Sequence, residues 1–275
     1  MAVNANSYAS NAIQGQPGVA GDVNLFETSS NPKFALGYGF EAQDGRKFRY
    51  SHFGAAVTAG RVVSADASES SAALNALTIV APASAAVTTD GNASQKFIEI
   101  TEPSITQDQY EGGYLVMTAG TGRGYTYRVK GNSVTGLPDG PASGNLRLEL
   151  WDNLQIGLTA DSDVILTGIK WGNLEVATST DTVVAGVAVA THVANRYGWV
   201  QTKGICGVLE EGTLVAGDIV TASDVTDGAV QQLAGYDASN DIQEAAAEPI
   251  VGYAIDPGAN TTAEGTLASV NLTLE

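Results

Sequence analysis

The sequence predicts an all-β protein, made of antiparallel β-sandwich or β-tulip-like barrel units with long loops, an extended N-terminal arm and little helix. Many short segments alternate apolar and polar residues, which is typical of half-buried strands. The chain contains 32 glycines, and glycine accommodates the tight turns of antiparallel sheets. Charged residues make up 16% of the chain, below the ~25% of an average globular domain, and no long segment has helical periodicity.

The 275 residues are enough for one large or two small domains. We expect an extended N-terminal arm at residues 1–30, an N-terminal and middle β region at residues 31–178, and a C-terminal β domain at residues 179–275. The arm is polar and too poor in apolar residues for a core of its own. It is either a disordered tail or a segment that becomes ordered against a neighbouring subunit.

In the N-terminal region, an alternating segment at Phe34–Phe40 is followed by Asp44-Gly45, a signal for a hairpin turn. The expected return strand, Lys47–Phe53, places Phe48 and Tyr50 on one face. The next segment, Ala59-Gly-Arg-Val-Val-Ser-Ala65, matches Ala216-Gly-Asp-Ile-Val-Thr-Ala222. The match indicates either a weak internal repeat, each copy with an aromatic-x-aromatic strand upstream, or a coincidence of common residues.

In the middle of the chain we expect a hairpin over residues 110–130, with its turn at Gly120–Gly124. Strict alternation predicts that Leu146, Leu148 and Leu150 face a core. Further strands are expected at residues 96–101, 163–167 and 182–190, and the last is almost wholly apolar, so it should be covered on both faces. The type of structure in the Ala-rich residues 70–89 stays open.

Residues 190–222 form the centre of the best-defined domain. A strand carrying Tyr197 and Trp199 is followed by an apolar run and an acidic turn at Glu210-Glu211-Gly212. The last expected strands are at residues 248–255 and 268–274. We predict that four aromatic side chains are core or subunit-interface anchors: Tyr197, Trp199, Phe48 and Tyr50.

The composition argues against several classes of partner and segment. The formal net charge of −17 repels nucleic acid, whose binding requires Lys and Arg, and disfavours anionic membranes. It fits either a generic soluble surface or docking onto a basic partner. The N-terminus has no secretory signal pattern and no apolar run approaches the ~20 residues of a membrane span. We therefore expect synthesis and folding in a cytoplasm.

The candidate chemical motifs are weak, so we expect no enzymatic activity, cofactor or metal. Gly120–Gly124 lacks the spacing and following helix of a phosphate loop. His52 and His192 are the only histidines and Cys206 the only cysteine, too few for a typical structural zinc site. Cys206 is expected to be a small core residue, without a disulfide partner in its own chain.

Two carboxylate pairs, Asp161/Asp163 and Glu210/Glu211, keep a polysaccharide hydrolase open as an alternative. Both pairs fall at predicted strand ends, where solvated turns belong. The acidic loop at residues 237–241 offers oxygen ligands for calcium but lacks EF-hand spacing.

Residues 110–130 (Y-E-G-G-Y-L-V-M-T-A-G-T-G-R-G-Y-T-Y-R-V-K), residues 146–154 (L-R-L-E-L-W-D-N-L), residues 184–204 (V-A-G-V-A-V-A-T-H-V-A-N-R-Y-G-W-V-Q-T-K-G) and the closing P-I-V-G-Y-A-I-D and A-S-V-N-L-T-L resemble structural proteins of tailed bacteriophages. The unit of apolar strand, A-G-D-x-V, loop, P-x-V-G-x-A and a final strand is similar to head decoration (cement) proteins and head-fibre bases. The resemblance covers roughly residue 110 to the C-terminus. It implies a non-enzymatic virion component, usually trimeric, clamped on the outside of a capsid shell.

The function expected from these points is capsid decoration. The protein is expected to form a homo-oligomer, a trimer, that binds the major capsid protein on the exterior of the virion. It would stabilise the head by bridging capsomers. The alternative within the virion is a head fibre, tail or spike part that contacts the host surface. A major shell protein is not expected, because that fold needs a long helix.

Overall fold

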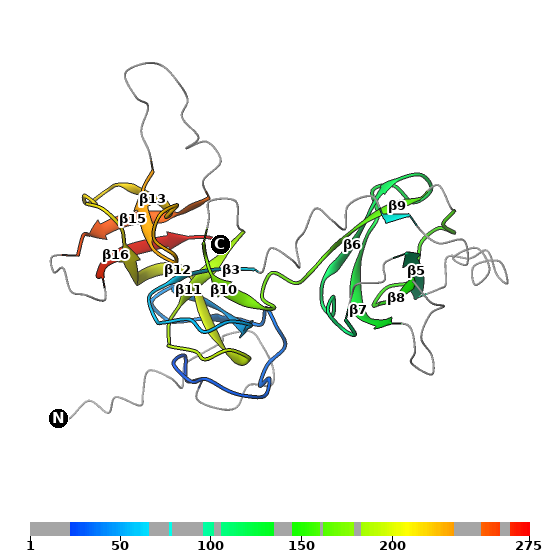
Figure 1. Ribbon diagram of the computed structural model, residues 1–275, viewed down its shortest axis with the longest axis horizontal. Helices are drawn as coiled ribbons and strands as arrows, with labels where there is room; N and C mark the ends of the chain where they lie inside the picture. Colours follow the sequence, from blue (N-terminus) through cyan, green and yellow to red (C-terminus); the bar gives the residue numbers. More distant parts are fainter. Residues whose placement is uncertain are drawn as a thin grey trace, which may run out of the picture. The chain divides into compact units, whose positions relative to one another are not determined.

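The computed structural model describes residues 23–65, 77–78, 96–101, 106–134, 145–159, 162–178, 183–233, 249–258 and 265–275 (Figure 1). All regular structure in these residues is β-strand, and the described part contains no helix. The predicted all-β class is therefore confirmed. In the described residues, no helix is long and apolar enough to cross a membrane. Most of the expected N-terminal arm lies outside the described residues.

The chain forms two compact units, one inserted in the other. Unit 1 comprises residues 1–66 and 170–275, and unit 2 comprises residues 67–169. The domain break predicted between residues 178 and 179 falls inside unit 1. Local patterns could not place the boundaries, because unit 1 is assembled from strands on both sides of the insertion.

Unit 1 contains ten strands: β1 Gly39–Glu41, β2 Lys47–Phe53, β3 Val62–Ala65, β10 Leu174–Val176, β11 Val184–Ala188, β12 Arg196–Glu210, β13 Ile219–Ala222, β14 Val230–Gln232, β15 Ile250–Asp256 and β16 Thr266–Thr273. The hairpin predicted around Asp44-Gly45 is present, since β1 pairs antiparallel with β2. Its first strand is shorter than predicted, because Gly37 has a positive φ of 78° and Phe34 and Tyr38 pack on an aromatic cluster instead.

The first half of β12 closes a ring of five strands, in the order β2-β10-β3-β11-β12 and back to β2. Four of its contacts are antiparallel, while β2 and β10 run parallel. The enclosed side chains are apolar: Phe53, Val57, Val63, Leu174, Ala185, Ala188 and Val200. This first barrel therefore has a continuous interior core.

The second half of β12 closes another ring of five strands, in the order β12-β14-β13-β15-β16 and back to β12. Here too four contacts are antiparallel and one, between β12 and β14, is parallel. Buried apolar side chains from these strands share one cluster, among them Val208, Val220, Ala222, Val230, Val251, Ala254 and Val270. The predicted central stretch thus holds the strand that both barrels share.

The two barrels repeat one topology. The strand orders coincide when the strands are matched in chain order. In this match β2 corresponds to the second half of β12, β3 to β13, β10 to β14, β11 to β15, and the first half of β12 to β16. In this match Val63 corresponds to Val220, since Val63 pairs with Val176 and Gly186 in the first barrel and Val220 pairs with Gln232 and Gly252 in the second. The matched heptads at residues 59–65 and 216–222 are therefore structurally equivalent, which favours the internal repeat over coincidence.

Hydrogen bonds in the two barrels agree with this register. The amide of Gly60 donates to Ala188 O, and that of Gly217 donates to Ala254 O, each over 2.8 Å. Gly60 and Gly217 both have a positive φ, of 82° and 96°, which is why the heptad carries glycine at this place. Unit 2 enters between β3 and β10, where the second barrel has only the connection from β13 to β14.

One part of the repeat prediction is wrong. The aromatic pairs Phe48/Tyr50 and Tyr197/Trp199 are not equivalent, because they face each other across neighbouring strands, with Trp199 opposite Tyr50. The positions equivalent to Phe48 and Tyr50 are Ile205 and Gly207. The sequence could not separate these arrangements, since both place an aromatic strand upstream of the heptad.

Unit 2 is a six-stranded sheet in the order β4-β9-β6-β7-β8-β5. Its strands are β4 Leu77–Thr78, β5 Phe97–Thr101, β6 Tyr114–Ala119, β7 Thr126–Val134, β8 Asn145–Leu150 and β9 Asp163–Thr167. Leu146, Leu148 and Leu150 are fully buried in its core, as the alternation predicted. Strands β6 and β7 form the predicted hairpin, and its turn has positive φ values at Gly120, Gly122 and Gly124.

Candidate interaction surfaces

The four predicted anchors lie in one aromatic cluster on the outside of the first barrel. Phe48 and Tyr50 come from β2, and Tyr197 and Trp199 from the neighbouring β12. Phe48, Tyr50 and Trp199 are at most 2% exposed, whereas Tyr197 is half-buried at the margin. Because side chains alternate along each strand, these rings lie on the outer face of the barrel and point away from its interior. A segment outside the barrel strands must therefore cover them.

Residues 23–42 provide that cover. The Trp199 ring lies 5.4 Å from Phe34, 5.9 Å from Phe40 and 5.3 Å from Tyr50, between ring centroids. The ring planes are tilted or near perpendicular, geometries that aromatic pairs prefer to face-to-face stacking. Phe34, Tyr38 and Phe40 were not predicted as anchors. Their spacing resembles a strand, and no local signal shows that they cross over another strand pair.

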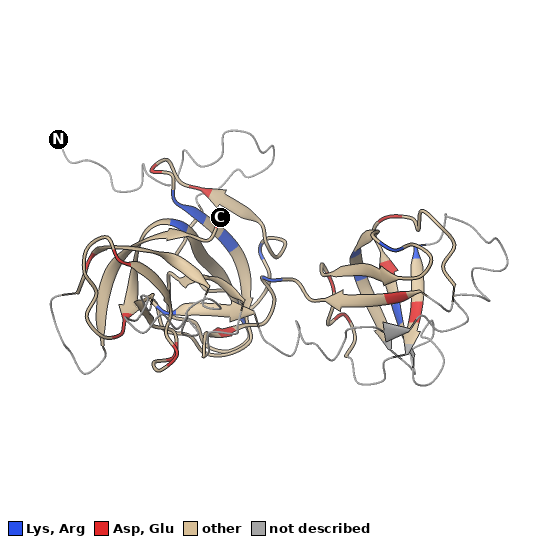
Figure 2. Ribbon diagram, turned by 90° about the horizontal axis from the view of Figure 1, so that it is seen from above, with Lys and Arg blue, Asp and Glu red and all other residues tan. Residues whose placement is uncertain are grey.

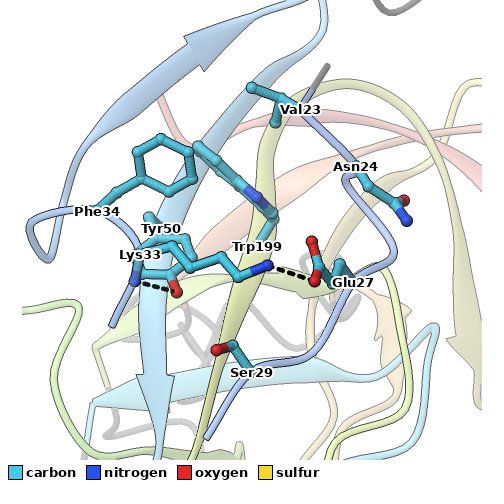
Figure 3. Close-up of a pocket in the computed structure, with 8 residues that line it drawn as sticks. All are labelled: Val23, Asn24, Glu27, Ser29, Lys33, Phe34, Tyr50 and Trp199. Atoms are coloured by element: carbon cyan, nitrogen blue, oxygen red, sulfur yellow. Dashed lines mark hydrogen bonds and ion pairs between the residues drawn. The ribbon is translucent and has the colours of Figure 1, made fainter. Parts of the chain in front are cut away.

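A small pocket of about 120 Å³ lies under this covering segment (Figure 3). Trp199, Phe34 and Tyr50 form its aromatic wall, and Glu27 and Lys33 form an ion pair at its polar side. The Tyr50 hydroxyl accepts a hydrogen bond from the Lys33 amide over 3.0 Å. Burial raises the pKa of Tyr50. These contacts tie residues 23–34 to the barrel surface.

The buried titratable groups have structural roles. The His192 ring is 1% exposed and stacks on Phe53 at 3.8 Å between centroids. Burial lowers its pKa to about 4, so the imidazole is neutral at pH 7. Cys206 packs against the core of the second barrel, and burial raises its pKa to about 12. A thiol held protonated in this way is a poor nucleophile.

Of the two carboxylate pairs considered for catalysis, Glu210 and Glu211 bind backbone amides of neighbouring segments. The Glu210 carboxylate accepts a hydrogen bond from the Gly258 amide over 3.2 Å, and Glu211 accepts one from the Thr226 amide over 2.9 Å. Asp163 is in β9, and Asp161 lies outside the described residues. The possible calcium loop at residues 237–241 also lies outside them. Among the residues that the structure describes, no three His, Cys, Asp or Glu side chains group as metal ligands.

The second barrel has an apolar outer surface without the cover that the first barrel has. Ile205 on β12 and Leu267 on β16 are 59% and 53% exposed. They correspond to Phe48 and Tyr197 in the first barrel. The outward positions between and beside them include Gly207, Ser269 and Asn271, and the exposed Lys203, two residues before Ile205 on β12, places a positive charge at the edge of the surface. We call the five uncharged residues the β12–β16 face. Figure 2 shows how few strand residues of unit 1 are charged.

A second uncovered patch lies on β13 and β15. Ile219, Ile250 and Tyr253 are 47%, 53% and 40% exposed. Ile219 pairs directly with Tyr253 across the two strands. We call these three residues the β13–β15 face.

Unit 2 carries an exposed aromatic and cationic row. Tyr114 on β6 pairs with Arg128 on β7, and the Trp151 amide donates to Arg128 O over 3.0 Å. All three side chains are exposed. Aromatic faces beside a guanidinium suit stacking on sugar rings and contact with an acidic substituent.

Comparisons with known proteins identify no relative of this chain. No family model, no curated protein and no solved structure matches it.

Proposed function

We propose that the protein is a non-enzymatic capsid decoration (cement) protein of a tailed bacteriophage. It binds the outer surface of the major capsid protein shell as a homotrimer, after assembly in the host cytoplasm. The β12–β16 face carries this proposal. The equivalent face of the first barrel packs under residues 23–42, so the topology presents an apolar surface that an extended segment can cover.

The chemistry of this face indicates the kind of shell surface it fits. Its centre is Ile205 and Leu267, which lose apolar exposure on contact with a loop or extended arm of the shell protein. The rest of the chain is strongly acidic, with a formal net charge of −17. A shell site with an apolar centre and basic surroundings therefore complements it.

Stabilisation of the head follows from repeated contacts. A standard interface buries about 1,600 Å² in total, and a trimer that touches several capsomers gains avidity because its second and third contacts are intramolecular. The capsomers are then held together against outward pressure without any covalent step.

The test is binding to shells that lack the protein. Wild-type protein should add in a fixed ratio and raise the temperature at which shells release DNA. Ile205→Glu and Leu267→Glu should weaken binding at least about tenfold, because each buries a charge in the contact. Val193→Glu, at a 60% exposed position of the first barrel, is the matched control. Undiminished binding by both face variants would reject the proposal.

A second candidate function is supported by the Tyr114–Arg128–Trp151 row of unit 2. We propose, as the alternative, that the chain belongs to a head fibre, tail or spike and contacts a host surface saccharide through this row. Glycan-array binding that disappears in Trp151→Ala, together with normal shells in its absence and lost host adsorption, would favour this candidate over decoration.

A further inference from the structure

The β13–β15 face repeats a surface that the same chain buries elsewhere. By the register of the two barrels, its residues match three valines of the first barrel: Ile219 matches Val62, Ile250 matches Val184, and Tyr253 matches Val187. In both barrels the three positions point away from the interior, because the residues next to them in sequence point inward. Val63 and Ala185 belong to the core of the first barrel, and Val220 and Val251 belong to the core of the second.

The three valines are covered by the second barrel. Val62 and Val187 are fully buried and Val184 is 4% exposed. All three belong to the same cluster as Val208, Val220 and Val270 of the second barrel. The Val62 amide also donates to Gly228 O, between β13 and β14, over 2.8 Å. This surface of the first barrel is therefore a barrel-to-barrel interface.

In the second barrel the matched surface is open, although its side chains are larger and still apolar. A repeat surface that faces solvent instead of a neighbouring repeat is normally polar. The second barrel presents Ile219, Ile250 and Tyr253 on this surface. Exposed apolar patches of this kind mark interaction sites.

We propose that the β13–β15 face is the contact between copies of this chain, with a barrel of a second copy as its occupant. In the first barrel, the same positions already pack against a barrel of this chain, so this pair of strands can accept a barrel as its neighbour. The face carries no charged side chain. Two chains with a formal net charge of −17 repel each other over most of their surfaces, and association is least opposed where both are uncharged.

The face adjoins the one proposed to bind the shell, because Tyr253 pairs with Asn271 and its hydroxyl accepts a hydrogen bond from the Asn271 side-chain amide. The inference concerns other side chains, and it stands without the shell. The homotrimer of the proposed function needs a contact between copies, and this face is our assignment of it. Dimers would identify an isologous pair of faces, and trimers a closed ring of head-to-tail contacts.

The experiment measures the particle mass of the purified full chain by light scattering and mass photometry. We expect a multiple of the 28.2 kDa chain mass for the wild type, and a single-chain mass for Ile219→Glu and for Tyr253→Glu at the same concentration. Val193→Glu should keep the wild-type mass. A wild type that is monomeric at micromolar concentration, or an oligomer that persists in both face variants, would overturn the proposal.

Folding and shell binding are separated in the same samples. Circular dichroism and the melting temperature show whether each variant keeps its β fold, and a Tyr253→Ser variant provides a milder change if the glutamate unfolds the barrel. Loss of the oligomer in a folded variant supports the inference even if no variant or wild type binds shells. Binding to shells by a monomeric wild type would support decoration of the shell and reject both the homotrimer and this inference.

Discussion

The two barrels of unit 1 have the same strand order and register, yet the outer surface of the first is covered by other parts of the chain and that of the second is largely exposed. Around the first barrel, residues 23–42 cover the aromatic cluster and the second barrel covers Val62, Val184 and Val187. Around the second barrel, the large apolar side chains at matched positions are exposed: Ile205, Leu267, Ile219, Ile250 and Tyr253. The difference teaches that interior positions specify the repeated fold, while outer positions are free to become either intramolecular or intermolecular contacts.

Interior positions of the two barrels carry similar residues. Val63 matches Val220, and Ala188 matches Ala254, and all four are buried. Outer positions have diverged: Trp199 matches Ser269, and Tyr50 matches Gly207. The following changes test this contrast, from the largest expected effect to the smallest.

Trp199→Ala should destabilise unit 1 by about 3–5 kcal/mol, because it removes the centre of the aromatic cluster and leaves a cavity. The equivalent change in the second barrel, Ser269→Ala, should alter stability by less than about 0.5 kcal/mol, since this small side chain is only partly buried and lies outside the core. Urea unfolding of both variants measures the difference. Equal changes in the free energy of unfolding would show that the two matched positions are not covered to different degrees.

Gly252→Ala and Gly186→Ala should each destabilise the fold by roughly 1–3 kcal/mol through overpacking. A Cβ at Gly252 would lie 2.1 Å from Asn271 O, and one at the matched Gly186 would lie 2.7 Å from Gln201 O. Gly207→Ala is the control, since a Cβ there meets nothing within 4 Å. Denaturant midpoints that did not separate the two matched glycines from Gly207 would argue against a shared register.

His192 should make the first barrel sensitive to acid. Its pKa of about 4 in the folded protein is below the ordinary value near 6.5. The stabilisation by the neutral ring is therefore complete above pH 6.5 and declines as the pH falls towards 4, by about 2 kcal/mol at pH 5. His192→Phe should lose less stability between pH 7 and pH 5 than the wild type. Parallel pH profiles of unfolding for the two proteins would contradict this assignment.

Cys206 should react slowly, in keeping with its place against the second core. Because its pKa is about 12, alkylation by iodoacetamide at pH 8 should be at least ~100-fold slower in the folded protein than in denaturant. Mass spectrometry over a time course measures both rates. Rapid labelling of the folded protein would show that this side of the second barrel opens readily.

Local patterns predicted much of the fold but little of its closure. Alternation located Leu146, Leu148 and Leu150 in a core, and Asp44-Gly45 marked a real hairpin, because strand periodicity and turn geometry are local properties. Ring closure depends on one parallel contact in each barrel, such as Phe53 with Leu174. Those residues lie on either side of the inserted unit 2, and no periodicity reports a contact over that separation.

The candidate surfaces were predictable only in part, for the same reason. Tyr197, Trp199, Phe48 and Tyr50 are conspicuous because aromatic residues are few, at 7% of the chain. Whether an outward residue is covered depends on segments distant in sequence. Ile205 and Phe48 occupy matched positions and are both apolar, and only the structure shows that one is covered and the other is not.

The central claim is that the outer surface of the second barrel is completed by other molecules in the native assembly. Carbene footprinting measures it most directly, by comparing side-chain labelling in the dilute purified chain with that in assembled particles. We predict several-fold protection of Ile219, Tyr253, Ile205 and Leu267 in particles, with Val193 labelled equally in both. Equal labelling of the two faces in dilute and assembled protein would contradict the account.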